Sequence, residues 1–320
     1  MASKRLTATI SQVAKLLSNK QRIALFAHTN PDGDTVGSCV ALCLALRSLG
    51  HFVSVFCDME LSDDLSSFAQ GVEISTSFEG KYDLMVAVDC ADILRLGKFS
   101  GVYDRFAETL TIDHHGGDYF SKYNCVLQYA SNCQIIYELL CVLKVKIDLP
   151  IATSLFVGVC TDTGNFMHSN TDESSFALAA NLMKYGVDSE YVSRVFFKQT
   201  SLAKTKLIGK ALSRIRAYYD EQMMLVYVTK SDLDELGVDF RVTSGIVQYA
   251  INVDTAKIGV CMTESAPNTY KVSMRGKDFV VRDICMEFGG GGHPYASACV
   301  ISGFLEDVIE KIVRVVGFYL

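Results

Sequence analysis

The sequence predicts an α/β protein with two domains: a doubly wound parallel sheet at the N-terminus and a smaller domain of mixed α/β structure at the C-terminus. Through the first half of the chain, apolar strand-like segments alternate with helical segments, which is typical of a parallel sheet covered on both faces. After Asp220 the pattern changes, and three further strands are interspersed with helices. The length of 320 residues agrees with two domains, because a domain usually contains about 100–200 residues.

The N-terminal domain is expected to begin with an amphipathic helix whose apolar face carries Ile10, Val13, Leu16 and Leu17. Its strands are predicted at residues 22–27, 52–57, 83–88 and 109–112. Helices are predicted at 35–49, 132–144, 151–162 and 172–185, and mostly helical structure at 188–216. Gly50 fits the position that ends the helix beginning at Thr35.

The C-terminal domain is expected to contain strands at 223–229, 256–264 and 269–276. Its helices are predicted at 231–237, 241–250 and 304–317. We therefore divide the chain into an N-terminal domain at 1–186, a helical linker at 187–214 and a C-terminal domain at 215–320.

Composition and charge restrict the class of protein. Hydrophobic residues make up 49% of the chain and charged residues 21%, so the chain is globular rather than disordered. The net charge of −6 argues against binding long duplex nucleic acid, which needs a broad basic surface. The N-terminal segment has no long apolar core, and the most apolar stretch, 40–49, is too short to span a bilayer. We expect a cytoplasmic protein without a membrane anchor.

Eleven cysteines are scattered through the chain without a CxxC pair. This usage predicts buried thiols in a reducing compartment rather than a disulfide framework. A basic stretch between the two domains is either the solvated face of a linker helix, which we favour, or a basic wall beside an anionic substrate. Its residues are Lys198, Lys204, Lys206, Lys210, Arg214 and Arg216.

Polar residues follow the first predicted strand. His28, Asp32 and Asp34 lie in the segment HTNPDGD directly after residues 22–27. Ligands in open parallel sheets sit at the carboxyl ends of the strands, so this loop can direct an imidazole and two carboxylates at one point. The alternative is an Asp-rich turn in which Asp34 caps the following helix.

Acids and histidines also follow the later strands. Asp89 comes directly after residues 83–88, and Asp113, His114 and His115 end the strand at 109–112. Burying such groups without partners is costly, and metal ligation would satisfy them. Each acid alone could instead be a turn residue bound to a backbone amide.

Asp162 ends a buried segment and precedes Gly164, which permits a sharp turn. On its own this signal is weak. Together with the strand ends it completes a set of six candidate ligands, enough for two cations if one carboxylate bridges them. Oxygen-rich ligands with some imidazole suit Mn²⁺ or Mg²⁺. The candidate ligands are His28, Asp32, Asp34, Asp89, His114 and Asp162.

A run of glycines in the C-terminal domain can form an anion-binding concavity from backbone N–H groups. The alternative is a flexible loop. Arg275 is the expected companion, since Ser273 and Arg275 alternate with Val272 and Met274 along their strand. The residues of the proposed anion site are Arg275, Gly290, Gly291, Gly292 and His293.

These motifs, taken in order, resemble the DHH phosphoesterase family, named for the triplet Asp113-His114-His115. Its four N-terminal motifs are similar to HTNPDGDTVGS, VAVDCAD, TIDHH and VCTDTGNF, and GGGGHPYASA is similar to the glycine-rich motif of the DHHA1 domain. The resemblance covers nearly the whole chain.

The resemblance implies a two-metal hydrolase with its active site in a cleft between the two domains and Mn²⁺ as the favoured cation, with Mg²⁺ as the alternative. One metal would be held by His28, Asp32 and Asp89, and the other by Asp34, Asp89, His114 and Asp162. Asp113 would orient a histidine, and His115 would face the scissile phosphate. Arg275, His293 and the glycine motif would bind the terminal phosphate of a nucleotide.

Within the family, the size and two-domain plan resemble the bifunctional oligoribonuclease and phosphoadenosine-phosphate phosphatase group. The expected substrates are short single-stranded oligoribonucleotides, hydrolysed 3′ to 5′, and 3′-phosphoadenosine 5′-phosphate. A phosphodiesterase of cyclic dinucleotides or their linear products is the alternative enzyme, and a nucleotide-binding regulatory protein is the alternative outside catalysis. A homodimer is compatible with the resemblance.

Two residues depart from the family pattern. Asp118 stands where the family usually has Asn, and Cys299 stands where it has a glycine. The first adds a negative charge after the DHH triplet, and the second changes the surroundings of the glycine motif.

Overall fold

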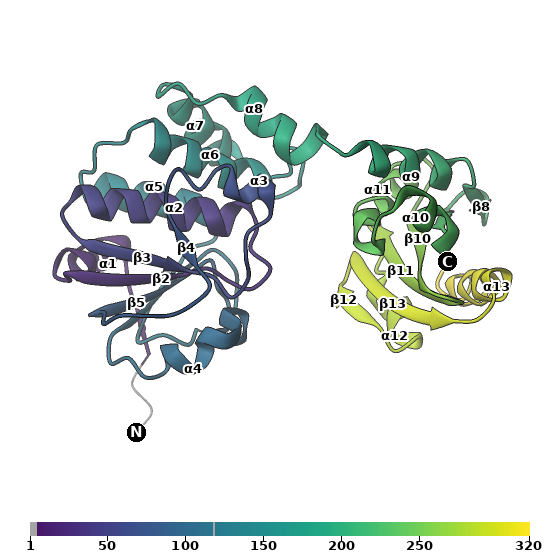
Figure 1. Ribbon diagram of the computed structural model, residues 1–320, viewed down its shortest axis with the longest axis horizontal. Helices are drawn as coiled ribbons and strands as arrows, with labels where there is room; N and C mark the ends of the chain where they lie inside the picture. The colour runs from purple at the N-terminus through teal and green to yellow at the C-terminus, as the bar shows by residue number, and fades with distance from the viewer. Residues whose placement is uncertain (1–4, 118) are drawn as a thin grey trace. The chain divides into compact units, whose positions relative to one another are not determined.

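The computed structural model describes residues 5–117 and 119–320, so Asp118 lies outside the described residues. Contacts divide the chain into two compact units, Met1–Gln199 and Thr200–Leu320 (Figure 1). Each is an α/β unit with its own sheet and its own hydrophobic core.

The N-terminal unit is built on a seven-stranded sheet in which every neighbouring pair is parallel, in the order β1-β7-β6-β5-β2-β3-β4. The strands are β1 (Leu6–Thr7), β2 (Arg22–Phe26), β3 (Phe52–Phe56), β4 (Ile74–Ser75), β5 (Leu84–Val88), β6 (Thr109–Asp113) and β7 (Tyr123–Val126). The four predicted strands are β2, β3, β5 and β6, and the predicted parallel sheet is confirmed.

Helices cover both faces of this sheet, because side chains of one strand alternate between two cores. Ile23 and Leu25 of β2 pack into the larger core, and Ala24 and Phe26 pack into an aromatic core on the opposite face. Figure 1 shows α2, α5 and α6 on one side and α4 on the other. The helices are α1 (Ile10–Ser18), α2 (Gly33–Ser48), α3 (Asp63–Ser66), η1 (Ile93–Phe99), α4 (Ser100–Tyr103), α5 (Asn132–Val142), α6 (Leu149–Asp162), α7 (Glu173–Met183), α8 (Ser189–Ser193) and η2 (Arg194–Lys198).

The strand order reverses between β2 and β5. From β2 the chain adds β3 and β4 on one side, whereas β5, β6 and β7 extend the sheet on the other. Such a reversal opens a crevice at the carboxyl ends of the two central strands, where α/β sheets bind their ligands. Residues after β2 and β5 therefore meet there.

The C-terminal unit is a six-stranded mixed sheet in the order β12-β13-β11-β10-β9-β8, in which only β9 and β10 pair in parallel among the described residues. Its strands are β8 (Arg216–Tyr218), β9 (Met223–Val228), β10 (Ile258–Ala266), β11 (Thr269–Gly276), β12 (Gly291–His293) and β13 (Ala296–Ser302). Its helices are α9 (Leu202–Leu212), α10 (Lys230–Leu236), η3 (Phe240–Thr243), α11 (Val247–Ile251), α12 (Arg282–Glu287) and α13 (Leu305–Val316).

One expectation for this unit needs correction, and one of the alternatives does not hold. The helix predicted over 241–250 is split into η3 and α11, because Gly245 between them has φ +87° and cannot continue a right-handed helix. The glycine motif is not a loop throughout, since Gly291–His293 form the edge strand β12.

Two side-chain expectations, the buried cysteines and the alternation along β11, are met. Ten cysteines are buried free thiols and only Cys141 is exposed. Val272 and Met274 point into the core while Ser273 and Arg275 face a hollow on the other side of β11.

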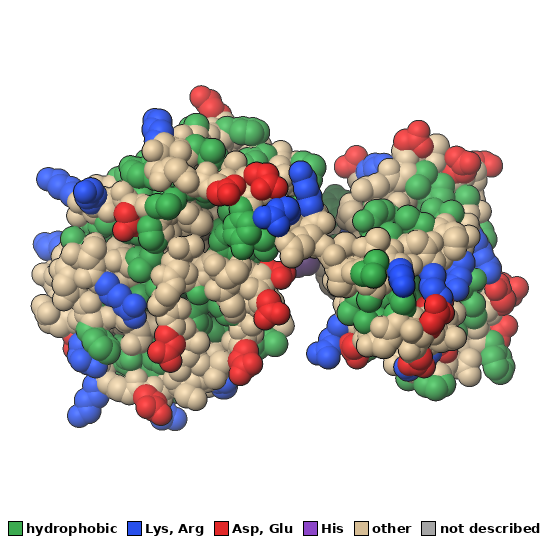
Figure 2. Space-filling model, turned by 45° about the horizontal axis from the view of Figure 1, so that its top comes forward, with side chains coloured by type: hydrophobic (Ala, Val, Ile, Leu, Met, Phe, Trp, Pro, Cys, Tyr) green, Lys and Arg blue, Asp and Glu red, His purple; other side chains and the backbone are tan. Residues whose placement is uncertain are grey.

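None of the described helices is both long enough and apolar enough to cross a membrane. Acidic and basic side chains are interspersed on the face shown in Figure 2.

Half of the basic stretch is paired with acids within the C-terminal unit. Arg216 binds Glu306 with two hydrogen bonds of 2.7 and 2.8 Å. Lys210 on α9 and Arg214 just after it both contact the buried carboxylate of Asp232. Arg214 Nη2 lies 3.0 Å and Lys210 Nζ 3.2 Å from Asp232 Oδ1. Burial would raise the pKa of Asp232, but Arg214 and the Thr229 amide hold it well below its ordinary value.

We expect Asp232→Ala to destabilise the C-terminal unit by about 2–3 kcal/mol, because it removes the acceptor of hydrogen bonds from Arg214 and from the amide and hydroxyl of Thr229. The folded pKa of Asp232 is lowered, so its stabilisation is complete above the ordinary pKa of 3.8 and is lost as the pH falls below it. Urea denaturation of the full-length protein at pH 7 and pH 3, with hydrogen exchange identifying the transition of this unit, measures both effects.

The matched control is Asp234→Ala, which removes an exposed acid of the same helix that pairs with Lys230. A surface pair contributes about 0–1 kcal/mol. Equal effects of the two substitutions would contradict the role assigned to Asp232.

Candidate metal centre

The loop between β2 and α2 places the first three candidate ligands. His28 follows β2 directly and is buried, and Asp32 is the N-cap of α2, where its Oδ1 accepts the Thr35 amide at 2.9 Å. The alternative interpretation of this loop named Asp34 as the cap, and the structure places Asp34 inside the first turn instead. The capping bond leaves Asp32 Oδ2 at 3.6 Å from His28 Nε2.

Asp89 lies in the crevice at the end of β5. Its backbone has φ +59°, a left-handed conformation that is uncommon for a residue with a side chain. The amide of Asp89 still continues the sheet by donating to Ile112 O at 2.8 Å. The unusual backbone turns the buried carboxylate toward the residues that follow β2 and β6. Such conformations cluster at functional sites.

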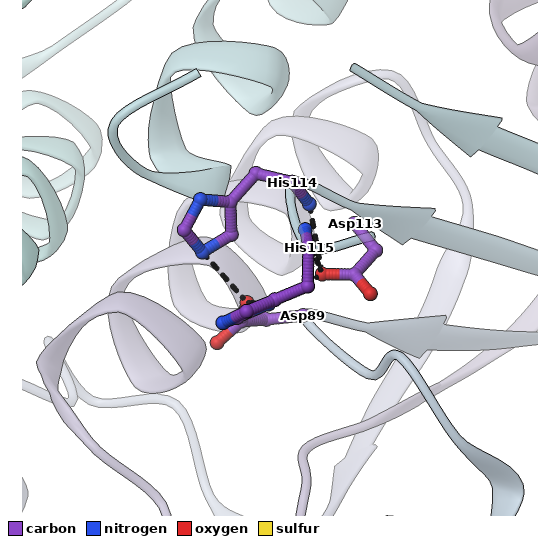
Figure 3. Close-up of side chains that lie close together, drawn as sticks. All are labelled: Asp89, Asp113, His114 and His115. Atoms are coloured by element: carbon purple, nitrogen blue, oxygen red, sulfur yellow. Dashed lines mark hydrogen bonds and ion pairs between the residues drawn. The ribbon is translucent and has the colours of Figure 1, made fainter. Parts of the chain in front are cut away.

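Asp113 organises the DHH triplet at the end of β6. Its Oδ1 accepts three hydrogen bonds: from the His114 amide at 2.8 Å, the His115 amide at 3.1 Å and His115 Nδ1 at 2.9 Å. Figure 3 shows Asp113 beside His115, while the His114 ring turns toward Asp89. Asp113 therefore fixes both the backbone of the triplet and the ring of His115.

His114 connects the triplet with α2 and α6. Its Nε2 lies 3.2 Å from Asp162 Oδ2, 3.4 Å from Asp89 Oδ1 and 3.8 Å from Asp34 Oδ2. Asp162 is the last residue of α6, so a helix end rather than a strand end supplies this acid.

Asp34 has supports that the sequence did not indicate. Its carboxylate oxygens accept the backbone amides of Asn132 and Cys133 at 2.5 and 2.9 Å, at the N-terminus of α5. Gly158 of α6 leaves room for this arrangement, since a Cβ there would lie 2.5 Å from Asp34 Oδ1. These contacts link residues almost one hundred positions apart, and no local motif encodes them.

The structure brings together all eight residues expected at the N-terminal site. They form three overlapping groups in which the potential ligand atoms lie within 4.8 Å of one another. Asp89 and His114 each belong to two groups, so the groups are one connected site. The groups are His28, Asp32 and Asp89; Asp34, His114 and Asp162; and Asp89, Asp113, His114 and His115.

Three buried atoms at the centre have no hydrogen-bond partner among the described residues: His28 Nε2, His114 Nε2 and Asp89 Oδ1. Both rings are fixed from behind, since His28 Nδ1 lies 2.8 Å from Thr29 O and His114 Nδ1 lies 3.0 Å from Tyr129 O. A carbonyl only accepts, so each Nδ1 carries the proton and each Nε2 faces the carboxylates. Buried polar atoms left unpaired in this way fit metal ligation.

Without a cation, the three histidines balance the buried carboxylates. Burial would lower the pKa of His28, but Asp32 and Asp89 raise it to about 9. At His114, burial would likewise lower the pKa, but Asp162 raises it to about 9. Asp113 and Asp89 raise the pKa of His115 to about 10.

The carboxylates divide into two kinds. Burial would raise the pKa of Asp89, but the nearby rings of His115 and His28 and the Thr35 hydroxyl hold it far below its ordinary value. Burial and the neighbouring acids raise the pKa of Asp34, and burial raises that of Asp162. Divalent cations would relieve the repulsion among these acids.

In the C-terminal unit, Arg275 and Gly291 line a hollow of about 280 Å³. Arg275 forms no ion pair with the described residues, and its Nη1 donates only to Met274 O at 2.9 Å. The remaining polar walls come from residues that sequence analysis did not select. They are Arg241, Thr243, Ser244, Thr263, Lys271, Ser273 and Ser297.

The other members of the predicted anion site lie beside this hollow rather than in its walls. Gly290 packs so closely on β13 that a Cβ would lie 2.3 Å from Ala298 O, which accounts for a glycine there. A Cβ on Gly292 would lie 2.7 Å from Ala296 O, so this position also favours glycine. His293 is exposed on β12. Cys299, the departure from the family pattern, is buried against Gly290.

Residues 22–159 match the DHH family, N-terminal domain, and residues 220–318 match the DHHA1 domain. The chain is 29% identical to the bifunctional oligoribonuclease and PAP phosphatase NrnA of Mycoplasma genitalium, over 95% of this chain and 98% of that one. It is 28% identical to the protein of the same name from Thermus thermophilus, over 96% and 92% of the two chains.

Among solved structures, an exopolyphosphatase-related protein from Bacteroides fragilis has the same fold. It superposes with a TM-score of 0.87 at 21% identity and covers 97% of this chain and 96% of that one. The two family models match both halves of the sequence, and the two-sheet architecture agrees with them. The chain therefore belongs to the DHH phosphoesterase family, with a DHHA1 domain after its DHH domain.

Proposed function

We propose that this protein hydrolyses short oligoribonucleotides from the 3′ end, and also 3′-phosphoadenosine 5′-phosphate, with two divalent cations. The observation that carries the proposal is the set of unpaired buried atoms on His28, His114 and Asp89, which lie within three overlapping groups of potential ligands. Two relatives of the chain are bifunctional oligoribonuclease and PAP phosphatase proteins by name, which supports the choice of substrates.

The proposed ligand sets are drawn from these groups. His28, Asp32 and Asp89 would hold one cation. The second set would be Asp34, Asp89, His114 and Asp162. With oxygen and imidazole ligands and no thiolate, Mn²⁺ suits the site best and Mg²⁺ is the alternative. When bound, such a pair of cations polarises the phosphoryl group and lowers the pKa of a water molecule.

His115 is the proposed catalytic side chain. Asp113 holds its Nδ1 at 2.9 Å, while the side chain remains 41% exposed, so its other nitrogen can meet a substrate. In the metal-free protein, Asp113 and Asp89 raise the pKa of His115 to about 10, so the ring is protonated at neutral pH. A protonated ring can donate a hydrogen bond to a phosphoryl oxygen or a proton to the leaving oxygen.

Both proposed reactions break the same kind of bond. Release of a 5′-nucleotide from an oligoribonucleotide and removal of the 3′-phosphate from 3′-phosphoadenosine 5′-phosphate each cleave phosphorus from a ribose 3′ oxygen. One arrangement of cations and His115 therefore serves both reactions, and the rest of the substrate decides which is favoured.

The C-terminal unit is proposed to bind the terminal phosphate of the substrate. Among the described residues, Arg275 has no acidic partner and Lys271 in the same hollow has no ion pair. Gly290, Gly291, Gly292 and His293 would offer backbone and imidazole donors beside the hollow. A substrate with a phosphate at its far end gains these contacts, whereas one without it does not.

A substrate panel tests the proposal. With Mn²⁺, the full-length protein should convert di- to pentanucleotides to mononucleotides and release phosphate from 3′-phosphoadenosine 5′-phosphate, more slowly with Mg²⁺. Faster turnover of cyclic dinucleotides than of linear ones would favour the cyclic-dinucleotide alternative, and binding of nucleotides without any turnover would favour a regulatory protein.

Replacing the shared carboxylate is the sharpest test of the centre. We expect Asp89→Asn to lower kcat on every substrate by about 1,000-fold or more, because both ligand sets lose a charge. Asp92→Asn is the matched control, since Asp92 is an exposed acid three residues away that caps η1 through the Leu94 amide. Retained activity of Asp89→Asn would contradict the shared role.

Metal binding should release protons. His28 and His114, with pKa values raised to about 9, are protonated at neutral pH in the metal-free protein and must lose a proton to ligate a cation. Adding Mn²⁺ in weak buffer at pH 7 should release about two protons per molecule. Affinity should rise with pH up to about 9, and an affinity independent of pH between 6 and 9 would contradict this ligand set.

Arg275→Gln tests the phosphate site. Loss of a charge-assisted hydrogen bond should raise KM for 5′-phosphorylated dinucleotides about 10–100-fold, with kcat nearly unchanged. Dinucleotides without the 5′-phosphate should be unaffected. Arg282→Gln, which removes an exposed arginine paired with Asp283, is the control. An equal loss on both kinds of dinucleotide would remove Arg275 from this role.

A further inference from the structure

Thr35 connects two of the candidate ligands from inside the first turn of α2. It is fully buried. Its hydroxyl donates to Asp89 Oδ2 at 2.5 Å, and its backbone amide donates to Asp32 Oδ1 at 2.9 Å. The hydroxyl bond is the shortest polar contact of Asp89 with any described residue.

The hydroxyl bond fixes the rotation of the Asp89 carboxylate. Oδ2, which accepts from Thr35, lies 3.4 Å from His28 Nε2, and Oδ1 lies 3.4 Å from His114 Nε2. Each oxygen thus faces the histidine of one of the two proposed ligand sets. A carboxylate free to rotate about its Cβ–Cγ bond would keep this arrangement for only part of the time.

The contact differs in kind from the other contacts of Asp89. His28 Nε2, His114 Nε2 and His115 Nδ1 each lie 3.4 Å from an Asp89 carboxylate oxygen, and none of them forms a hydrogen bond with it. The Thr35 hydroxyl donates to Asp89 whether or not a cation is bound. Its support therefore persists in the state in which the carboxylate would work.

We propose that Thr35 is a positioning residue that holds Asp89 with one oxygen toward each ligand group. This inference rests on the metal centre proposed above. The β-branched side chain suits the task, because helical threonines use few rotamers and the methyl group fills the space beside the hydroxyl. Outer partners of metal ligands typically change metal affinity 10–100-fold when removed.

The test measures Mn²⁺ affinity without any substrate. Metal-free, full-length protein is titrated with Mn²⁺ while the free ion is followed by its electron paramagnetic resonance signal. We expect Thr35→Val, which keeps the shape and removes the hydroxyl, to weaken affinity roughly 10-fold. Thr35→Ser, which keeps the hydroxyl, should stay within about 3-fold of the unaltered protein, less than the 10-fold expected for an outer-partner loss.

Thr111→Val is the matched control. Thr111 is also buried, and its hydroxyl lies 2.5 Å from Ser121 Oγ, with no contact to a candidate ligand. This variant should lose thermal stability but bind Mn²⁺ like the unaltered protein. A merely structural role for Thr35 predicts the same behaviour for Thr35→Val.

Unchanged Mn²⁺ affinity in folded Thr35→Val would overturn the inference, as would equal weakening in Thr35→Ser. If Thr35→Val does not fold, Thr35→Ala compared with Thr35→Ser decides by the same criterion. Unaltered protein that binds no Mn²⁺ would refute the metal centre and, with it, the role of Thr35. Normal binding by the unaltered protein with no effect of the substitution refutes the role of Thr35 alone.

Discussion

The N-terminal unit depends on placing several carboxylates together away from water. Asp34, Asp89 and Asp113 are all buried, and Asp162 is within reach of the same imidazole. Ionised acids at such distances repel one another strongly, and burial adds to the cost. The other features of the centre supply positive charge or hydrogen-bond donors, which offset the repulsion between the acids and the cost of burying them.

The groups that stabilise the buried carboxylates come from distant parts of the chain. Protonated histidines supply charge when no cation is present, and backbone amides supply donors at Asp34 and Asp113. The reversal of strand order makes this convergence possible, because it opens one crevice at the ends of β2 and β5. A sheet with another order would leave the same residues apart.

The sequence alone predicted the parts that depend on local pattern. Apolar strands ending in acids predicted β2, β5 and β6 and most of the candidate ligands, because parallel strands share one carboxyl edge. Short strands such as β1 and the edge strand β12 escaped prediction, since they form by pairing with neighbours rather than from their own composition.

Contacts across long separations were also out of reach. The amides of Asn132 and Cys133 at Asp34, and the Thr35 hydroxyl at Asp89, depend on how α2, α5 and β5 pack. Likewise, the polar walls around Arg275 come from four separate segments, so no linear motif indicates them. Only Gly245 carried a local signal that could have divided the predicted helix at 241–250.

The bond between Asp34 and the N-terminus of α5 makes one carboxylate part of both the scaffold and the centre. Loss of the side chain would leave two buried amides unpaired and loosen the docking of α5 on α2. Alanine scanning at this position therefore reports an inseparable mixture of misfolding and lost chemistry. In a lineage that gave up catalysis, Asp34 would still be retained for folding, so its presence in a relative is weaker evidence of activity than the presence of His28.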